Sequence, residues 1–466
     1  MSEQIEHRQI QFGVFFQGVN FGTIWSHEHS GEQMAFDTFR RVAQTAERGL
    51  FSTFFLGEGL RLREHLGNIH QLDIAGRPDA QTQLAALAAV TEQIGLVTTQ
   101  NTTFNDPADI AYRLASLDIL SGGRAAWNIV TTDNAWTGAN FRRGAWLDTA
   151  DRYRRAAEFV EAAGQLWSAW AGGAVSDSTA AESWASPGTV TPVEFEREFT
   201  RFTSSRVLPA TAQTRPVLFQ AGDSDEGRDF AVRHADVVFS AHHELEDATE
   251  FANDIRVRLA RTGRRREELL LFPSQVIILD ATDAAAEEKA RWVRHAQITP
   301  QTAIAYLEQI WGKDLSHYDP DGPLPAEDPV LEVTDNTRGV GLRGHRSRET
   351  AQRWRAESEQ LGLSIREFVI SVATRKGIVG SYATAADRIG EFVASGAVDG
   401  FNISPYLVPD GLDDIVDHLI PELQERGLYR TEYPGLTLRD NLGLPAFQHP
   451  PAPTSLPQKT PRGEQK

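Results

Sequence analysis

The sequence predicts an α/β protein, a closed (β/α)8 TIM barrel with insertions in its βα loops, and three observations support this. Apolar runs of strand length alternate with segments of helical period, and eight such pairs follow one another. The strand segments are almost continuously apolar, which is typical of a parallel sheet covered on both faces. No Gly-x-Gly-x-x-Gly follows the first strand, which disfavours the runner-up, an open doubly wound sheet.

The first four strand–helix pairs follow one another closely. Their strands are expected at 10–16, 51–58, 94–102 and 125–132, and their helices at 36–50, 80–93, 106–121 and 151–170. The third helix has the clearest boundaries. Asp106 stands at its N-cap, Pro107 is its first helical residue, and Gly122 and Gly123 supply a C-terminal stop.

The last four pairs complete the predicted barrel. Their strands are expected at 216–222, 235–241, 269–280 and 399–406, and their helices at 225–234, 245–263, 283–296 and 412–427. Because each strand is followed by a helix, the eight strands are expected to run parallel, with their carboxyl ends at one end of the barrel.

Two segments interrupt this alternation. We interpret both 171–215 and 297–398 as insertions on the top face of the barrel, the second with extra helices near 347–361 and 383–395. The remainder forms one domain, so we expect a single barrel over 1–446. The Pro-rich tail over 447–466 is expected to be disordered.

Composition excludes several classes of function. The net charge of −18 argues against a general affinity for nucleic acid or for an anionic membrane surface. The chain has no cysteine, which excludes disulfides, thiolate catalysis, zinc–thiolate sites and iron–sulfur clusters. The N-terminus lacks the pattern of a signal peptide, and no apolar run approaches the ~18 residues of a membrane span. We therefore expect a cytoplasmic protein.

Polar residues stand at the carboxyl ends of the predicted strands, where TIM barrels carry their active sites. These residues are Gln17, Glu58, Thr99 to Thr102, Thr131, Thr132, Ala221 to Ser224, His242 and His243. Hydroxyl groups predominate and only one carboxylate is obvious. We therefore expect neither a metal site nor the carboxylate pair of a glycosidase. A hydroxyl-rich ring suits a polar heterocycle or a phosphate.

The turn after the fifth predicted strand favours a phosphate. Residues 220–227 read QAGDSDEG, so a strand ends in Ala-Gly and a helix begins directly after Ser224. Backbone N–H groups at a helix N-terminus, with a serine hydroxyl beside them, form a phosphate site. Short βα loops of this composition are also common without any ligand, so a purely structural role remains an equal alternative.

The fourth predicted strand, AAWNIVTT at 125–132, raises two further questions. Trp127 is interpreted as a core residue. Asn128 is a buried amide that needs partners, and it either ties adjacent strands together or reaches a ligand. Arg124, just before the strand, is expected to pair with a carboxylate at the bottom of the barrel.

Several long motifs resemble those of the bacterial-luciferase-like flavin monooxygenases. They are SLDILSGGRAAWNIVTT (116–132), NFRRG (140–144), DRYRRAAEF (151–159), PVLFQAGDSDEGRDFA (216–231) and PELQERGLYRTEYPGLTLRDNLGLP (421–445). The chain looks similar to the branch that contains the nitrilotriacetate, EDTA and dibenzothiophene-sulfone monooxygenases. The resemblance extends from about residue 8 to residue 445.

The resemblance implies which residues contact the flavin. Glu58 stands where the family usually has Asp, and Thr102 matches a hydroxyl at the end of the third strand. Tyr153 and Ser224 match residues that contact the flavin phosphate. Thr149 occupies the position of a common family His, so this sequence departs from the family there.

The family resemblance also implies the reaction. A separate NAD(P)H:flavin reductase supplies reduced FMN (FMNH2), which forms a flavin peroxide adduct with O2 and oxygenates a small organic substrate. Family members cleave C–N or C–S bonds or hydroxylate alkanes. The oligomeric states usual in the family suggest a homodimer or a homotetramer. The alternative is a deazaflavin (F420)-dependent oxidoreductase of the same superfamily; a flavin carrier and an unrelated barrel hydrolase are less favoured.

Some residues are candidates for the substrate site. The aromatic candidates for an apolar pocket are Phe15, Phe16, Phe21, Trp25 and Trp136. The candidate acid–base residues are His27, His29, His242 and His243. Arg142 and Arg143 are a basic pair that would favour an anionic substrate, or else a solvated surface pair. Covering loops are expected from 171–215 and 297–345, because the oxygen chemistry requires exclusion of water.

Overall fold

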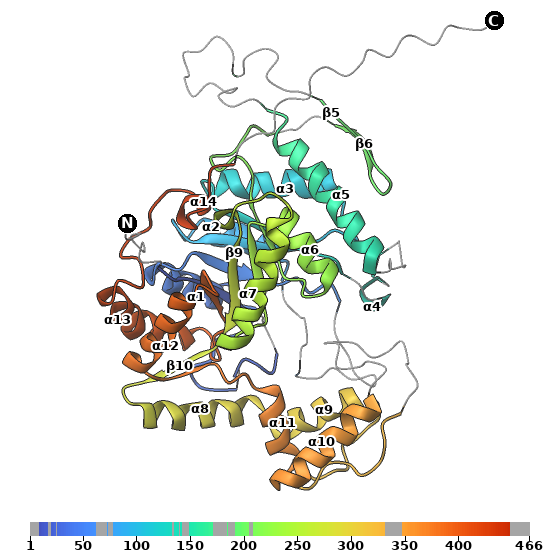
Figure 1. Ribbon diagram of the computed structural model, residues 1–466, viewed down its shortest axis with the longest axis vertical. Coiled ribbons are helices and arrows are strands. Elements are labelled where there is room, and N and C mark those ends of the chain that lie inside the picture. The colour runs from blue at the N-terminus through green and yellow to red at the C-terminus, as the bar shows by residue number, and fades with distance from the viewer. Residues whose placement is uncertain are drawn as a thin grey trace, which may run out of the picture.

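The computed structural model describes residues 9–16, 20–24, 26–61, 72, 78–132, 135–138, 140–141, 149–170, 184, 192–204, 208–330 and 347–447. Within these residues, eight parallel strands close into a barrel (Figure 1). The strands are β1 (Gln11–Phe16), β2 (Thr53–Leu56), β3 (Gly95–Asn101), β4 (Ala125–Val130), β7 (Val217–Gln220), β8 (Val237–Ser240), β9 (Leu270–Gln275) and β12 (Gly400–Ile403). Each strand pairs with its neighbours in chain order, and β12 pairs with β1. The predicted (β/α)8 barrel is confirmed.

Helices cover the outside of the barrel. Six of them follow the first six strands, namely α1 (Phe36–Arg48), α2 (Ala80–Ala88), α3 (Pro107–Leu120), α5 (Thr149–Trp167), α6 (Asp225–His234) and α7 (Leu245–Ala260). Outward strand residues such as Phe12, Phe54 and Leu96 are fully buried in the layer between strands and helices. Burial of both strand faces explains why the strand segments are apolar throughout. None of the described helices is long and apolar enough to cross a membrane.

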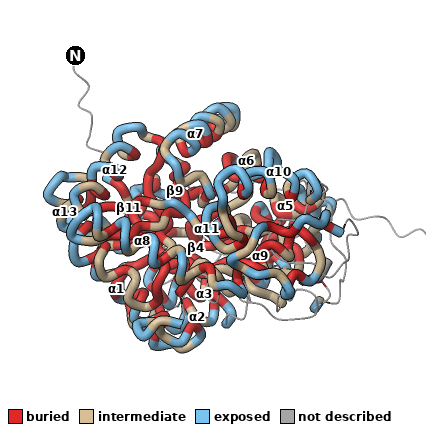
Figure 2. The backbone as a smooth tube through the Cα atoms, turned by 90° about the horizontal axis from the view of Figure 1, so that it is seen from below, coloured by how far each residue is buried: buried red, intermediate tan, exposed pale blue. Residues whose placement is uncertain are grey.

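The interior of the barrel is packed and closed at one end. Phe55, Val97 and Phe219 point inward and form a core with Leu438, the first residue of the short helix α14 (Leu438–Asn441), and with Leu442 directly after it. The packing is tight, since a β-carbon at Gly95 would lie 2.4 Å from Leu438 Cδ1. Figure 2 shows buried backbone running through the centre of the molecule. Helix α14 and its two leucines close the end of the barrel where the strands begin. The carboxyl ends of the strands therefore remain available for a site.

The seventh unit differs from the prediction. The expected strand 269–280 divides into β9 and a separate strand, β10 (Ile277–Asp280), which pairs with β11 (Ile378–Ser381) outside the barrel. The side chain of Gln275 accepts a hydrogen bond from the backbone N–H of Val276 at 3.0 Å, which takes that N–H out of the barrel ladder. In the sequence the break is marked by Pro273, Ser274 and Gln275, which separate two apolar runs.

The barrel helix of the seventh unit was also predicted wrongly. The expected helix 283–296 forms as α8 (Asp283–Gln297), but it packs against β10 and β11. The helix that covers the barrel is α12 (Tyr382–Ser395), which we had assigned to an insertion; its Phe392 ring lies 5.1 Å from that of Phe401 in β12. After β12, a π-helical turn (Ile415–Leu419) and α13 (Ile420–Glu425) take the place of the expected single helix 412–427.

The first predicted insertion lies elsewhere than expected. Its described part contains a hairpin of β5 (Val193–Glu196) and β6 (Arg201–Ser204), which contacts α5: the carboxylate of Glu158 accepts from the N–H of Phe199 at 2.8 Å. This segment joins the end of α5 to the start of β7, so it is an αβ connection and starts at the end where strands begin. Figure 1 shows the hairpin on the same side as α14, away from α9 to α11. The interpretation as a top-face βα loop is therefore wrong; 171–183, 185–191 and 205–207 lie outside the described residues.

The second insertion lies in the connection between the barrel strand β9 and the barrel helix α12, so it belongs to a βα connection. It carries α9 (Pro300–Trp311), α10 (Ser347–Leu361) and α11 (Ile365–Ala373), grouped at the lower end of the view in Figure 1. These helices form a core of their own around Trp311, Trp354 and Phe368, and Phe21 packs against it. The expected helix at 347–361 is confirmed. Residues 331–346, and the tail from 448 onward, lie outside the described residues, so the domain limits stay a prediction.

Arg124 holds the start of β4 by hydrogen bonds to backbone carbonyl groups, and not by the expected pairing with a carboxylate. Its side chain is 3% exposed and donates to four backbone carbonyls, those of Ser121 (2.7 Å), Thr91 (2.9 Å), Ile94 (3.0 Å) and Ala88 (3.1 Å). The planar guanidinium thus satisfies carbonyl groups in and after the last turns of α2 and α3.

Replacing Arg124 with lysine tests this role. Arg124→Lys keeps the charge but cannot reach all four carbonyls, so we expect the free energy of unfolding to fall by about 2–4 kcal/mol. Urea denaturation measures the change. The control is Arg353→Lys, at an exposed position of α10; equal stability of both variants would contradict the assignment.

Candidate functional site

The polar residues predicted at strand ends gather at one end of the barrel. Glu58 follows β2, Thr102 follows β3, Thr131 follows β4 and Ser224 follows β7. These strands lie side by side in the barrel and run parallel. The structure therefore brings these four residues to one face, as the sequence predicted; Gln17 lies outside the described residues.

The turn after β7 has the geometry of an anion site. Ser224 is the N-cap of α6, and its Oγ accepts from the N–H of Gly227 at 3.1 Å. The N–H groups of Asp225 and Glu226 precede the first intrahelical bond and have no helical carbonyl to pair with. They carry the positive end of the helix dipole, so this turn offers backbone donors and the Ser224 hydroxyl to an anion.

Tyr153 reaches this turn from α5. A β-carbon on Gly222 would lie 2.5 Å from Tyr153 Oη, and one on Gly227 would lie 2.8 Å from the same oxygen. A side chain at either glycine would therefore displace the tyrosine hydroxyl. The ring of Tyr153 packs on Phe230 of α6, with centroids 5.8 Å apart. Tyr153 and Ser224, which the resemblance assigned to one phosphate, thus lie at the same turn.

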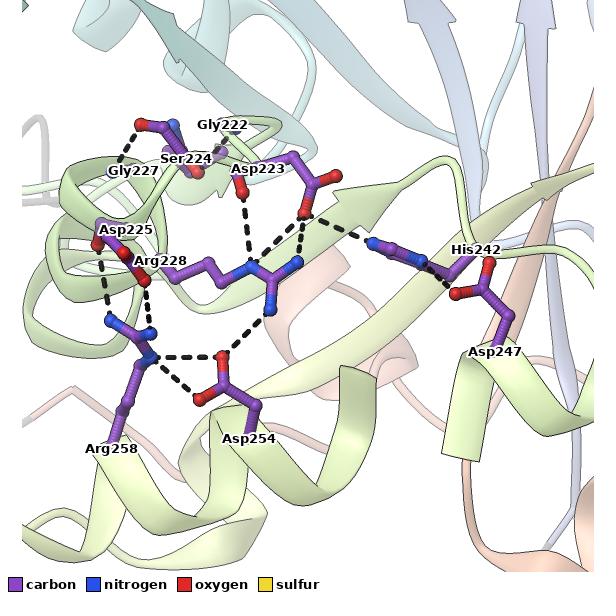
Figure 3. Close-up of polar contacts among 11 residues, drawn as sticks. Gly222, Asp223, Ser224, Asp225, Gly227, Arg228, His242, Asp247, Asp254 and Arg258 are labelled. Carbon is purple, nitrogen blue, oxygen red and sulfur yellow. Dashed lines mark hydrogen bonds and ion pairs between the residues drawn. The ribbon is translucent and has the colours of Figure 1, made fainter. Parts of the chain in front are cut away.

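The carboxylate next to Ser224 has side-chain partners. Asp223 stands beside Ser224, and its Oδ1 contacts Arg228 Nη2 at 2.8 Å and His242 Nε2 at 3.1 Å (Figure 3). Burial opposes ionisation of Asp223, but the hydrogen bonds from His242 and Arg228 outweigh it and lower the pKa. Asp223 is therefore a paired carboxylate, and its repulsion of an incoming phosphate is reduced. His242 also contacts Asp247 at 2.7 Å, which fixes its ring between two acids.

Glu58 forms the second polar cluster. Both of its carboxylate oxygens accept from Asn101 Nδ2 at 3.0 Å, across the ends of β2 and β3. Burial raises the pKa of Glu58 to about 7, although the hydrogen bond from Asn101 favours the charged form. Near neutral pH this carboxyl group is partly protonated, so it can either donate or accept a hydrogen bond. Both abilities suit the imide or amide edge of a heterocycle.

Thr102 and Asn128 tie β3 to β4. The N–H of Thr102 donates to the Val130 carbonyl at 3.0 Å, and Asn128 Nδ2 donates to Thr99 Oγ1 at 3.0 Å. The strand-tying role of Asn128 is thereby confirmed, while its Oδ1 has no partner among the described residues. Trp127 is fully buried and donates to the Gln100 carbonyl at 2.9 Å, which confirms it as core.

Other predicted residues are less informative. Thr149 is the first residue of α5, but its side chain lies outside the described part, as does that of Trp136 in α4 (Ala135–Gly138). Trp25, Arg142 and Arg143 also lie outside it. Among the candidate acid–base residues, the His27 ring packs on Trp292, His29 lies near Asp410, and His243 contacts its own loop carbonyl at Ala241.

A cavity of about 250 Å³ opens at the carboxyl ends of the strands. Phe15, Phe16 and Phe21 line it, as the sequence predicted. Two residues that the sequence reasoning missed, Arg294 and Arg375, line it as well. Arg294 belongs to α8 and Arg375 to the segment after α11, so tertiary packing brings them together and no local motif marks them.

A hydroxyl-lined turn at α6 and a cavity, both at the carboxyl ends of the strands, are typical of a barrel enzyme. The chain matches the family described as luciferase-like monooxygenase over residues 10–399, and it belongs to that family. The expected resemblance is confirmed, and the protein is a monooxygenase-family oxidoreductase.

Individual relatives match over almost the full length. Component A of the nitrilotriacetate monooxygenase of Aminobacter aminovorans is 34% identical, covering 94% of this chain and 97% of the relative. The N-acetyl-S-(2-succino)cysteine monooxygenase of Bacillus subtilis is 35% identical over the same shares. Among solved structures, a riboflavin lyase with modified FMN and substrate riboflavin has a TM-score of 0.76 and 29% identity, covering 94% of this chain and 97% of that one.

The pKa of Glu58 predicts a pH dependence of stability. The folded protein keeps the proton up to about pH 7, whereas the unfolded chain loses it near 4.5, so the free energy of unfolding falls as the pH rises through this window. Glu58→Gln removes the effect. Since solvent screens this half-buried side chain, we expect the variant to be about 1–3 kcal/mol more stable than the wild type above pH 7.5, and similar at pH 5.

Chemical denaturation at pH 5 to 8.5 measures this difference. The matched control is Glu357→Gln on the exposed face of α10, which should follow the wild-type profile. A Glu58→Gln profile that parallels the wild type would show that this carboxyl group has an ordinary pKa.

Proposed function

We propose that the protein is the oxygenase component of a two-component, FMNH2-dependent monooxygenase that oxygenates a small organic substrate with O2. The observation that carries this proposal is the turn at α6, where Ser224 and the hydroxyl of Tyr153 meet against two glycines. A phosphate fits there because the turn offers hydroxyl and backbone donors and its neighbouring carboxylate is already paired. FMN carries such a phosphate, and riboflavin does not.

Two further clusters are proposed to hold the flavin ring. Glu58 and Asn101 would contact its polar edge, because their shared hydrogen bonds place a protonatable carboxyl group at the end of β2. Thr102, buried after β3, would support the same edge, and Thr149 at the start of α5 would lie beside the phosphate turn. The cavity lined by Phe15, Phe16 and Phe21 would receive the substrate.

Reduced FMN, when bound, supplies the electrons with which O2 is activated for transfer of one oxygen atom. The chain's own task is to bind, orient and exclude water. We propose that α9, α10 and α11 perform the exclusion, since they pack on Phe21 at the mouth of the cavity. A separate NAD(P)H:flavin reductase would supply FMNH2, and the name of the Aminobacter relative, a component A, supports such a division. A homodimer or homotetramer is the assembly that we expect.

Removal of the hydroxyls at the turn should weaken the binding of FMN much more than the binding of riboflavin. For Ser224→Ala and Tyr153→Phe we expect each Kd for FMN to rise about 10- to 100-fold, since hydrogen bonds to a charged group contribute about 1.5–3 kcal/mol. The Kd for riboflavin should change less than twofold. Anaerobic titrations of both reduced flavins measure these values.

Ser364→Ala is the matched control, because Ser364 caps α11 with the same side-chain-to-backbone hydrogen bond but stands outside the site. It should cost stability and leave both flavin affinities unchanged. If Ser224→Ala lost affinity for FMN and for riboflavin by the same factor, the assignment of the phosphate to this turn would be contradicted. Tight binding of reduced F420 in place of FMN, without oxygen consumption, would favour the deazaflavin alternative.

A further inference from the structure

The cavity at the barrel mouth combines an apolar wall with unpaired positive charge. Its wall includes Phe15 at the end of β1, Val276 after β9 and Ile278 in β10. Within the described residues, the lining contains two arginines, Arg294 and Arg375, and no aspartate or glutamate. This is unusual for a chain with a net charge of −18.

Arg375 has little structural reason to lie there. Its one described hydrogen bond goes from Nη1 to the hydroxyl of Ser274 at the end of β9, and that hydroxyl lies 3.5 Å from Ser404 Oγ. A guanidinium carries five donors and the side chain of Arg375 is exposed, so most of its donors face solvent and have no protein acceptor in the described part of the chain. Partial desolvation lowers the pKa of Arg375.

Arg294 reaches the same cavity from α8. It forms no ion pair within the described residues. A second arginine-rich hollow lies at the opposite end of the barrel. There four of the five lining arginines contact one of two acids, as Arg215 contacts Asp236 at 2.9 Å and Arg265 contacts Glu268 at 2.9 Å. In the described lining of the cavity at the carboxyl ends, the two arginines have no such acid beside them.

We propose that the substrate is a small organic carboxylate whose anionic group binds to Arg375 and Arg294, with its apolar part against Phe15 and Phe21. The inference rests on the proposed function, in that it names the substrate class of the same site. Carboxylates match the planar fork of a guanidinium, and such charge-assisted pairs are strong where water is partly excluded. A local positive cavity would also attract an anion against the net charge of the chain. The volume of about 250 Å³ limits the buried part of the substrate to a small molecule.

The test compares carboxylates with neutral analogues of the same shape. The probes are 2-(phenylthio)acetate, its amide 2-(phenylthio)acetamide, nitrilotriacetate and nitrilotriacetamide, each titrated calorimetrically into the full chain. We expect at least one carboxylate to bind at least tenfold more tightly than its amide. Arg375→Gln and Arg294→Gln should each weaken that carboxylate at least tenfold and leave the amide unchanged. Arg375→Lys, which keeps the charge, should retain part of the preference.

Lys376→Gln is the matched control, since it removes one positive charge at the next residue, which is exposed as Arg375 is but does not line the cavity. Its carboxylate affinity should stay within twofold of the wild type. Equal affinity for carboxylates and amides, no binding of either at millimolar concentration, or an equal loss in Lys376→Gln would overturn the inference.

Titration of the same wild-type protein with FMN separates the two proposals. Tight FMN binding without carboxylate preference would overturn this inference alone. Carboxylate preference without FMN binding would overturn the proposed function and leave the anion site standing.

Discussion

The parallel closure of the barrel is the constraint on which the site depends. Because eight strands run the same way, every residue that follows a strand lies at one end, while the leucines around α14 seal the other. The apolar interior does not suit a polar ligand, so a polar ligand would bind to the polar groups at the open end. Glu58, Thr102 and Ser224 therefore meet although they are far apart in sequence.

Electrostatics divides this open end into two regions. At the α6 turn, Asp223 is held by Arg228 and His242, so the helix N-terminus and its hydroxyls remain attractive to a phosphate. At the cavity, Arg375 and Arg294 lack such acidic partners in the described chain, and an anionic substrate would supply them. A negatively charged protein can thus present two anion sites, one for a cofactor and one for a substrate, without becoming basic overall.

Local sequence signals predicted much of the fold and part of the site. The alternation of strand and helix segments was sufficient for the barrel, and QAGDSDEG was sufficient for the turn at Ser224. The break at Gln275 was missed, although Pro273, Ser274 and Gln275 interrupt the apolar run between β9 and β10. The assignment of α12 failed for a different reason: α8 and α12 are both amphipathic, and only tertiary contacts decide which one covers the barrel. Arg375 had no signal at all, because a long insertion brings it to the mouth.

A crystal structure of the protein with bound FMN would test the central claim most directly. The account predicts that the phosphate lies at the N-terminus of α6, with oxygens within about 3 Å of Ser224 Oγ and Tyr153 Oη. The flavin ring would then extend toward Glu58. A phosphate bound in the opposite hollow, beside Arg233 and Arg264, or an ordered flavin whose phosphate contacts neither hydroxyl, would contradict the account.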